Sequence, residues 1–219
     1  MNEPGVITAD PPQLVNQNGQ RIGAKGQRTR QRLIEVTVHL LETHGLRDLT
    51  VAEVARVAQT SPATFYVYFD GVPDVVLAAL AATSQTTPEL LDLLQQDWIG
   101  AEGKEKARTF VQLYCAQWES HRTVFRVRNL AAEEGDPRFM EARRGAVRGL
   151  LELLARRVAA ARSAGRVDPS TNGPAQAAAI LILLERLAAV RLLIVPGETD
   201  YGLVMHSAAD MIAHAMGAG

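Results

Sequence analysis

The stretch that decides the fold is residues 49–69, LTVAEVARVAQTSPATFYVYF. Thr50 is followed three residues later by Glu53, which is the spacing of a capping box: the hydroxyl takes the amide of the third helical residue and the glutamate reaches back. Ser61 followed by Pro62 is a second helix start, because serine caps well and proline suits the first helical position. The segment therefore predicts two short helices joined by a tight turn.

Helices are expected on both sides of this pair. A helix over residues 27–44 carries an apolar face made of Leu33, Ile34, Leu40 and Leu41, and Gly45 is expected to cap it in the left-handed region. The break at residues 70–73, DGVP, precedes another helix that begins near Pro73. A longer helix followed by two short ones predicts a tri-helical DNA-binding arrangement, in which the third helix presents its N-terminal residues to a major groove.

Composition sets the class of protein. The chain has 219 residues, 47% of them hydrophobic, which is enough for a sizeable core. Cys115 is the one cysteine, so no internal disulfide is possible, and this fits a reducing compartment. No signal peptide is apparent, and the most apolar stretch, residues 175–195, is interrupted by Glu185, Arg186 and Arg191. We therefore expect a cytoplasmic protein with no membrane span.

Charge distribution is more informative than the net charge of −1. Between Arg21 and Phe69 seven cations oppose four anions, a net charge of +3, whereas the rest of the chain is mildly acidic. A basic head on an acidic body is typical of a polyanion-binding module.

The rest of the chain predicts an all-α fold. Residues 1–22 are expected to be a mobile tail, residues 23–72 the helix-turn-helix domain, and residues 73–219 a helical ligand-binding and dimerisation domain. Helices in the last domain are expected over residues 87–99, 104–119, 121–134, 137–164, 174–194 and 200–216.

The segment from residue 33 to residue 69 resembles the TetR family of bacterial repressors. The matching residues are Leu33-Ile34, Gly45, Leu49-Thr50-Val51, Val54-Ala55, Ser61, Thr64-Phe65-Tyr66 and Tyr68-Phe69. The resemblance implies a phosphate near Thr50, base contacts from the start of the third helix, and DNA-backbone contacts from Tyr66 and Tyr68. It also implies a homodimer, here through residues 174–216, on a double-stranded, pseudo-palindromic operator.

Departures from the family pattern shape the expected interface. Gln59 stands where the family usually has a turn glycine, Thr37 where it has a small alanine, and Val72 where a lysine commonly holds a phosphate. Pro62 cannot read a base through a hydrogen bond, so readout is expected to rest on neighbouring residues, with added electrostatic attraction from two arginines. The full set of expected DNA-binding residues is Arg28, Arg30, Thr50, Gln59, Thr60, Ser61, Ala63, Thr64, Tyr66 and Tyr68.

The body carries an aromatic stripe. Phe110, Tyr114 and Trp118 are spaced at i, i+4 and i+8, and two readings stay open: plain core packing, or an apolar pocket with polar handles. On the second reading a small, largely apolar effector is bound by Phe110, Tyr114, Trp118, Phe125, Phe139, Arg143 and Glu185.

Other functions are weaker readings. His206, Asp210 and His214 are spaced for a metal, but they lie opposite the presumed apolar face of Tyr201, Val204, Ala208, Met211 and Ala215, which favours a solvated surface. The sequence shows no nucleophile–base pair and no phosphate loop, so we expect no enzyme, no metal and no cofactor. The leading hypothesis is a ligand-responsive homodimeric repressor, and the alternative is a TetR-like regulator without a small-molecule inducer, answering to a protein partner or acting constitutively.

Overall fold

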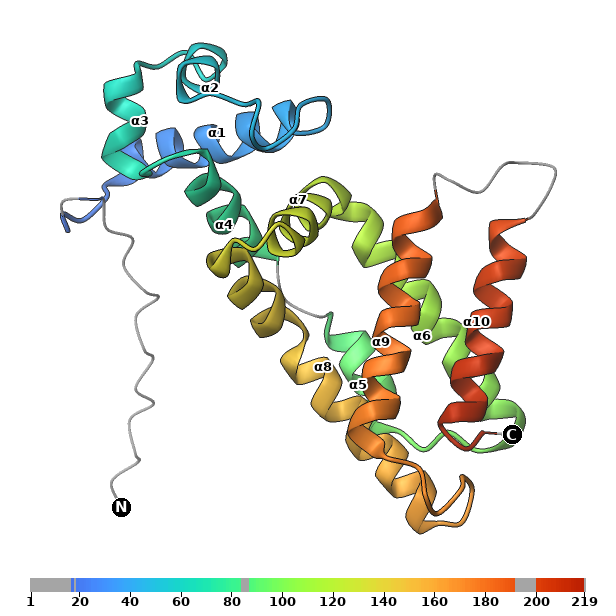
Figure 1. Cartoon of the computed structure of the whole chain (residues 1–219). Coiled ribbons are helices and arrows are strands. Elements are labelled where there is room, and N and C mark those ends of the chain that lie inside the picture. Colours follow the sequence, from blue (N-terminus) through green and yellow to red (C-terminus); the bar gives the residue numbers. More distant parts are fainter. Residues whose placement is uncertain (1–16, 18, 84–86, 192–199, 219) are drawn as a thin grey trace, which may run out of the picture. The chain divides into compact units, whose positions relative to one another are not determined.

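The computed structural model describes residues 17, 19–83, 87–191 and 200–218. Every regular element in that part of the chain is an α-helix (Figure 1), so the all-α prediction is confirmed. The ten described helices are α1 (Ala24–Leu40), α2 (Val51–Val57), α3 (Pro62–Tyr68), α4 (Val72–Thr83), α5 (Pro88–Gln95), α6 (Gly100–Ser120), α7 (Arg122–Glu133), α8 (Pro137–Ser163), α9 (Gly173–Val190) and α10 (Tyr201–Ala215).

The chain divides into two compact units, Met1–Ala79 and Leu80–Gly219. The domain limits expected at residues 22 and 72 stay predictions. The expected tail lies mostly outside the described residues. At its described end the Gln17 N–H donates to the Val67 carbonyl (3.1 Å), and Ile22 is buried.

In the first unit, α1 packs on α2, and α2 packs on α3. Leu33 and Phe65 are fully buried in this small core, and Phe65 lies 5.8 Å from the Phe69 ring. The Arg32 Nε donates to the Ala58 carbonyl (2.9 Å), which satisfies an exposed end of α2 and ties it to α1. These contacts fix the position of α3 within the unit.

Helix α1 ends at Leu40, four residues before the expected end, and the prediction of a left-handed cap at Gly45 is wrong. Gly45 is not among the residues with positive φ. Glycine is favoured at position 45 for a different reason. A Cβ there would lie 2.7 Å from a carboxylate oxygen of Asp48, so a side chain would collide with the turn. Close approach, and not backbone handedness, explains this position.

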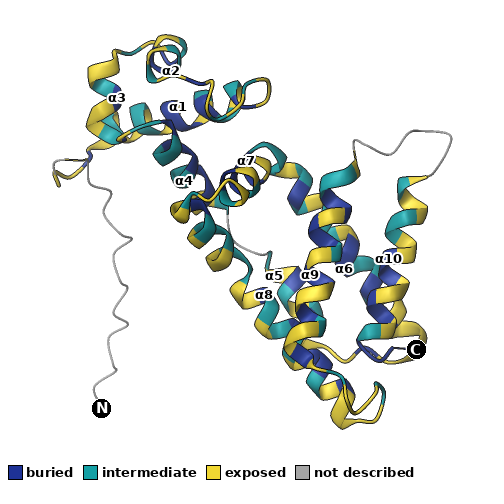
Figure 2. Ribbon diagram, viewed as in Figure 1, coloured by how far each residue is buried: buried dark blue, intermediate teal, exposed yellow. Residues whose placement is uncertain are grey.

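In the second unit, α8 packs on α7, α9 and α5, and α6 packs on α9 and α10. The core includes Trp98, Phe110, Leu154, Leu184 and Ile212. Figure 2 shows buried and exposed positions alternating along α8 and α9. The helices therefore bury one face each, as amphipathic helices of a bundle do.

By length and composition alone, α9 is apolar enough to cross a membrane, and so are α3 and α4 if they are taken as one bent span. Helix α9 nevertheless has the pattern of a core helix. Leu184 and Leu187 are buried in the bundle, while Glu185 and Arg186 interrupt the apolar run with charge.

The apolar face expected for α10 is partly wrong. Met211 is 63% exposed, whereas Ala209, Ile212 and Ala213 are buried with Ala208. The face that packs in the bundle is therefore rotated relative to the expected one, and Met211 belongs to the outer face.

Candidate functional site

Both predicted cap residues, Thr50 and Ser61, cap their helices, but the Glu53 carboxylate lies 3.9 Å from the His44 Nε2 and makes no hydrogen bond back to Thr50 among the described residues. The Glu53 N–H donates to the Thr50 Oγ1 (3.2 Å), and the Thr64 N–H donates to the Ser61 Oγ (3.1 Å). Pro62 occupies the first turn of α3, where its missing N–H costs no hydrogen bond. Each cap satisfies a donor that the helix start would leave open, so two seven-residue helices are held at defined ends.

The turn between them is a Schellman motif. The Thr60 N–H donates to the Ala55 carbonyl (2.9 Å) and the Gln59 N–H to the Arg56 carbonyl (3.1 Å). Gln59 is left-handed, with φ of 56°, the one described non-glycine residue with positive φ. Gln59 in place of the family's turn glycine therefore leaves the turn unchanged, but it places a strained residue there.

The start of α3 presents small side chains to solvent. Ser61, Pro62 and Ala63 are exposed, and they allow a close approach of another surface. The hydroxyl of Thr64 lies 3.0 Å from that of Ser61, so these two expected readers form one hydroxyl pair. Tyr66, one turn further on, is 54% exposed. The geometry offers a slender, exposed helix start, which suits a groove.

The remaining expected DNA-binding residues lie around this surface in different environments. Thr50, Gln59 and Arg28 are exposed, and Thr60 is half-buried. The Arg30 guanidinium lies 5.1 Å from the centre of the Phe69 ring and is partly buried, so it also packs the core of the unit. Tyr68 is half-buried beside α1, where a Cβ built on Gly26 would lie 3.2 Å from its hydroxyl.

The start of α4 explains one departure. Val72 is buried, with Val75 and Val76, so the position serves the core. The Asp70 N–H donates to the Asp74 Oδ2 (3.0 Å), which places a carboxylate in the first turn of α4. A carboxylate repels phosphate, so this helix start is a poor phosphate anchor.

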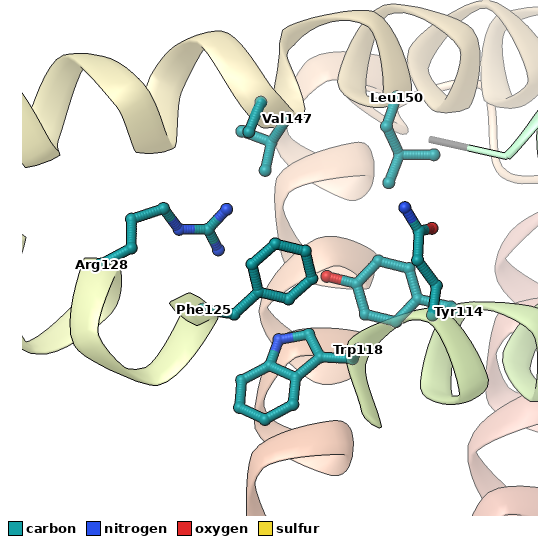
Figure 3. Close-up of a pocket in the computed structure, with 8 residues that line it drawn as sticks. Tyr114, Trp118, Phe125, Arg128, Val147 and Leu150 are labelled. Atoms are coloured by element: carbon teal, nitrogen blue, oxygen red, sulfur yellow. The ribbon is translucent and has the colours of Figure 1, made fainter. Parts of the chain in front are cut away.

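In the second unit, a small cavity opens between α6, α7 and α8 (Figure 3). It has a volume of about 40 Å³. Its lining is aromatic and aliphatic with polar atoms interspersed, and consists of Tyr114, Gln117, Trp118, Phe125, Arg128, Ala146, Val147 and Leu150.

Only some of the expected effector-binding residues line the cavity. Tyr114, Trp118 and Phe125 line the cavity, but Phe110 packs against Trp98 in the core, with ring centres 5.7 Å apart, and Phe139 is fully buried outside the lining. Residues four apart are rotated by about 40° around the helix axis, because four residues exceed one turn of 3.6 residues. Phe110, the first residue of the stripe, therefore faces away from the cavity.

Arg143 and Glu185 join the cavity through a buried ionic cluster. The Arg143 Nη2 donates to the Glu185 Oε2 (2.6 Å), and the Arg128 Nη2 lies 3.6 Å from the Glu185 Oε1. Sequence reasoning missed Arg128, which is 4% exposed and stacks 4.9 Å from the centre of the Phe125 ring. Its spacing of three residues from Phe125 on one helix was the available signal.

Burial governs the ionisation of this region. It lowers the pKa of Arg128, an effect that Glu185 opposes. Burial also raises the pKa of Tyr114, helped by the negative charge of Glu185. Tyr114 therefore stays a neutral phenol and a hydrogen-bond donor.

His206, Asp210 and Cys115 each make local contacts with neighbouring side chains. The His206 Nε2 lies 3.5 Å from Asp210, which is also 3.8 Å from Arg108, and the described residues contain no group of three potential ligands. The Tyr201 hydroxyl donates to the Cys115 Sγ (3.6 Å), and burial raises the pKa of the Cys115 thiol.

The outer faces of α9 and α10 carry exposed apolar residues, next to the polar side chains of Arg186, His206 and Asp210. Ile182, Leu203 and Met211 are each more than 60% exposed, with Ala178 and Ala179 beside them on α9. Ala177, Ala188 and Ala208 also lie in the segment expected to form the dimer, but they are buried inside the bundle.

Two family models match the chain. Residues 33–79 match bacterial regulatory proteins of the tetR family, and residues 90–193 match the C-terminal domain described as Tetracyclin repressor-like. Among curated protein sequences none matches.

Solved structures share the fold. The fatty acid degradation regulator FadR from Bacillus halodurans is 15% identical, with a TM-score of 0.63 over 84% of this chain and 94% of that one. FadR from Bacillus subtilis, in complex with stearoyl-CoA, is 13% identical, with a TM-score of 0.64 over 84% and 97%. A regulator from Saccharomonospora viridis, in complex with choline, is 16% identical, with a TM-score of 0.64 over 84% and 95%.

Members of the matched family are DNA-binding transcription factors rather than enzymes, and they form dimers. The capped helix pair lies within the N-terminal match, and the aromatic cavity lies within the C-terminal one. The chain belongs to the TetR family of transcriptional regulators.

Proposed function

We propose that this regulator is a homodimeric repressor whose affinity for its operator falls when a small, largely apolar effector binds the second unit. The observation that carries the proposal is the doubly capped α2–α3 pair, with exposed small residues at the start of α3 and an aromatic cavity elsewhere in the chain. The proposed site of action is the cytoplasm, where the chromosome of a bacterium lies.

Specificity is proposed to come from the turn and the start of α3. Gln59 keeps a strained left-handed conformation while its side chain is exposed, and strain of this kind concentrates at functional sites. Ala63 and the Ser61–Thr64 hydroxyl pair complete the proposed base-reading surface.

Phosphate contacts are proposed for the residues around that surface. Tyr66 is exposed enough to donate its hydroxyl without leaving its place in α3. Arg28 adds electrostatic attraction, and we assign the same role to Arg30, Tyr68, Thr50 and Thr60.

The dimer is proposed to form through the outer faces of α9 and α10. Ile182, Leu203 and Met211 give this surface its apolar area, and Ala178 and Ala179 permit close helix approach. A dimer places two reading heads about one DNA turn, ~34 Å, apart, which requires an operator with twofold symmetry. Ile182→Arg should convert the dimer to a monomer in light-scattering measurements, whereas Arg144→Ala, at an exposed position of α8, should leave it dimeric.

The effector half of the proposal rests on the cavity and on the two related folds that hold stearoyl-CoA and choline. One observation favours the alternative of a regulator without a small-molecule inducer. The cavity volume of about 40 Å³ is room for only a few water molecules and is well below the roughly 150 Å³ of a cavity that binds benzene. An effector of ordinary size therefore has to displace side chains as it enters.

A gel-shift assay at several salt concentrations tests the DNA half. Genomic fragments that carry the operator should be retained at salt concentrations that release random duplex, because base contacts outlast phosphate contacts. Equal affinity for all duplexes at every salt concentration would refute the proposal.

A further inference from the structure

We propose that the effector carries a carboxylate, which is held in the cavity by Arg128 with Trp118 and Tyr114 as further donors. This inference rests on the proposed effector response and deepens it, since it assigns a charge to a ligand that the sequence indicates only as largely apolar.

Arg128 is a buried arginine whose terminal amino groups can still accept a partner. It is 4% exposed and lines the cavity, and Figure 3 shows its guanidinium above the Phe125 ring. Its Nε donates to Asn129 (3.0 Å), but its Nη2 is 3.6 Å from Glu185, which is too long for a hydrogen bond. Within the described part of the chain, no hydrogen bond occupies its two terminal amino groups. A guanidinium with both of these groups available fits the two oxygens of a carboxylate.

The second step is the charge of the cluster. Arg128 and Arg143 share one carboxylate, that of Glu185, so the cluster holds a net charge of +1. Glu185 is nearer to Arg143, at 2.6 Å, which leaves Arg128 the less compensated cation. A buried charge without a full partner is costly, and a ligand anion would remove that cost.

The third step is the indole of Trp118. Its Nε1 is a buried donor with no hydrogen-bond partner among the described residues, although the ring lines the cavity. Tyr114 contributes a phenol that burial keeps neutral. The cavity therefore gathers several donors, while the Glu185 Oε1, 3.6 Å from Arg128, is a buried acceptor without a hydrogen bond among the described residues.

The fourth step is size. A volume of about 40 Å³ accepts a headgroup but not an alkyl chain or a ring. On the α8 side of the cavity Ala146 and Val147 are only half-buried, so the apolar body of the ligand is expected to leave the cavity past these two residues. The buried Arg128 therefore binds the carboxylate, and the apolar body of the ligand lies at the half-buried side of the cavity.

The experiment uses the full-length, ¹⁵N-labelled protein and its two indole N–H signals. Trp98 donates its Nε1–H to the Leu93 carbonyl (2.8 Å) in the core, so its signal serves as an internal control. The probes are two matched pairs, octanoate with octanamide and benzoate with benzamide, and octylamine as a cation of the same chain length. The Trp118 signal is identified by Trp118→Phe.

A carboxylate should shift the Trp118 signal while the Trp98 signal stays in place. At least one carboxylate should bind about tenfold more tightly than its amide, because hydrogen bonds to charged groups are roughly twice as strong as neutral ones. Arg128→Met should abolish that preference, and Arg144→Met, at an exposed position on α8, should keep it. If Arg128→Met does not fold, Arg128→Lys should keep a reduced preference for carboxylates over amides, because it retains the positive charge but loses the planar guanidinium that donates two parallel hydrogen bonds.

The outcomes separate the two proposals. Amides or octylamine that shift Trp118 as tightly as the carboxylates would overturn the carboxylate assignment and leave the effector response standing. If none of the five probes shifts Trp118, the carboxylate site is refuted, and the effector response then depends on whether a ligand without a carboxylate lowers operator affinity in the gel shift. Operator binding, measured separately by gel shift, decides the DNA half.

Discussion

Replacing Gln59 with glycine should stabilise the α2–α3 pair, and the size of the effect follows from the turn. A residue with a Cβ pays roughly 1–2 kcal/mol in the left-handed region, where Gln59 has φ of 56°. Glycine relieves this strain but loses about 0.4–1 kcal/mol, because it makes the unfolded chain more flexible. The net stabilisation of Gln59→Gly is therefore about 0.5–1 kcal/mol.

The chain supplies its own comparison. The helices α7, α8 and α10 end in the same pair of hydrogen bonds as α2, and in each the left-handed residue is a glycine: Gly135, Gly165 and Gly217. A Cβ on Gly165 would meet nothing within 4 Å, so Gly165→Gln isolates the backbone strain at a matched site. It should destabilise the end of α8 by about the amount that Gln59→Gly stabilises α2–α3.

Amide hydrogen exchange of the full chain, read by mass spectrometry on peptides from residues 51–69, measures the effect locally. A gain of about 0.7 kcal/mol slows exchange of protected amides about threefold. Gln59→Ala, which keeps the Cβ, should leave the rate unchanged. Equal slowing in the alanine and glycine variants, or no slowing in the glycine variant, would refute the strain argument. Operator affinity should fall in both variants, because both remove the proposed base-reading side chain.

Three further predictions follow from single side chains. Tyr66→Phe should weaken operator binding by roughly 1.5–3 kcal/mol and leave the thermal unfolding curve unchanged, since it removes one exposed hydroxyl; unchanged affinity in a gel shift would contradict the assigned phosphate contact. Thr37→Val should raise the free energy of unfolding by about 1 kcal/mol in denaturant titration, because the buried Thr37 hydroxyl lacks a hydrogen-bond partner among the described residues; a loss of stability would show that the hydroxyl is satisfied. Glu185→Gln should lower the free energy of unfolding by about 3 kcal/mol in the same titration, since it leaves two arginines without their carboxylate. The exposed Glu141, paired at 3.7 Å with Arg148, supplies the control Glu141→Gln, which should change stability by less than about 1 kcal/mol; equal effects of the two variants would contradict the buried cluster.

Local signals made the DNA-binding unit predictable. A helix cap involves residues within three positions of one another, so Thr50 with Glu53 and Ser61 with Thr64 could be expected from spacing alone. The positive φ of Gln59 was indicated by the family resemblance, which places a turn glycine at this position. Gly45 shows the limit: the carboxylate of Asp48, and not a helix end, determines that position.

The cavity was less predictable, because it depends on how helices pack. Phe110 and Trp118 lie on one stripe of α6, yet the rotation of the stripe sends one ring to Trp98 and the other to the cavity. Arg128 lies in a run with Arg122 and Arg126, and its spacing of three residues from Phe125 did not single it out, because Arg122 has the same spacing on the other side of Phe125. Its burial depends on Glu185, 57 positions away in the sequence.

The face of α10 illustrates the same difficulty. Apolar residues occur around most of this helix, so periodicity gave two acceptable faces and the expected one included Met211. The structure buries Ala209 and Ile212 against the bundle and leaves Met211 outside. An apolar outer face has no partner within one protomer, which is why it informs the proposed dimer rather than the fold.

Selection of duplexes from a random library, by the full-length protein at increasing salt, tests the central claim most directly. If the start of α3 reads an operator, one inverted-repeat motif should be enriched, with half-sites about one helical turn apart. The Ala63→Asp variant should lose this motif while its thermal unfolding is unchanged. Enrichment of no motif, or equal enrichment by the wild-type chain and the Ala63→Asp variant, would contradict the claim that the start of α3 reads an operator.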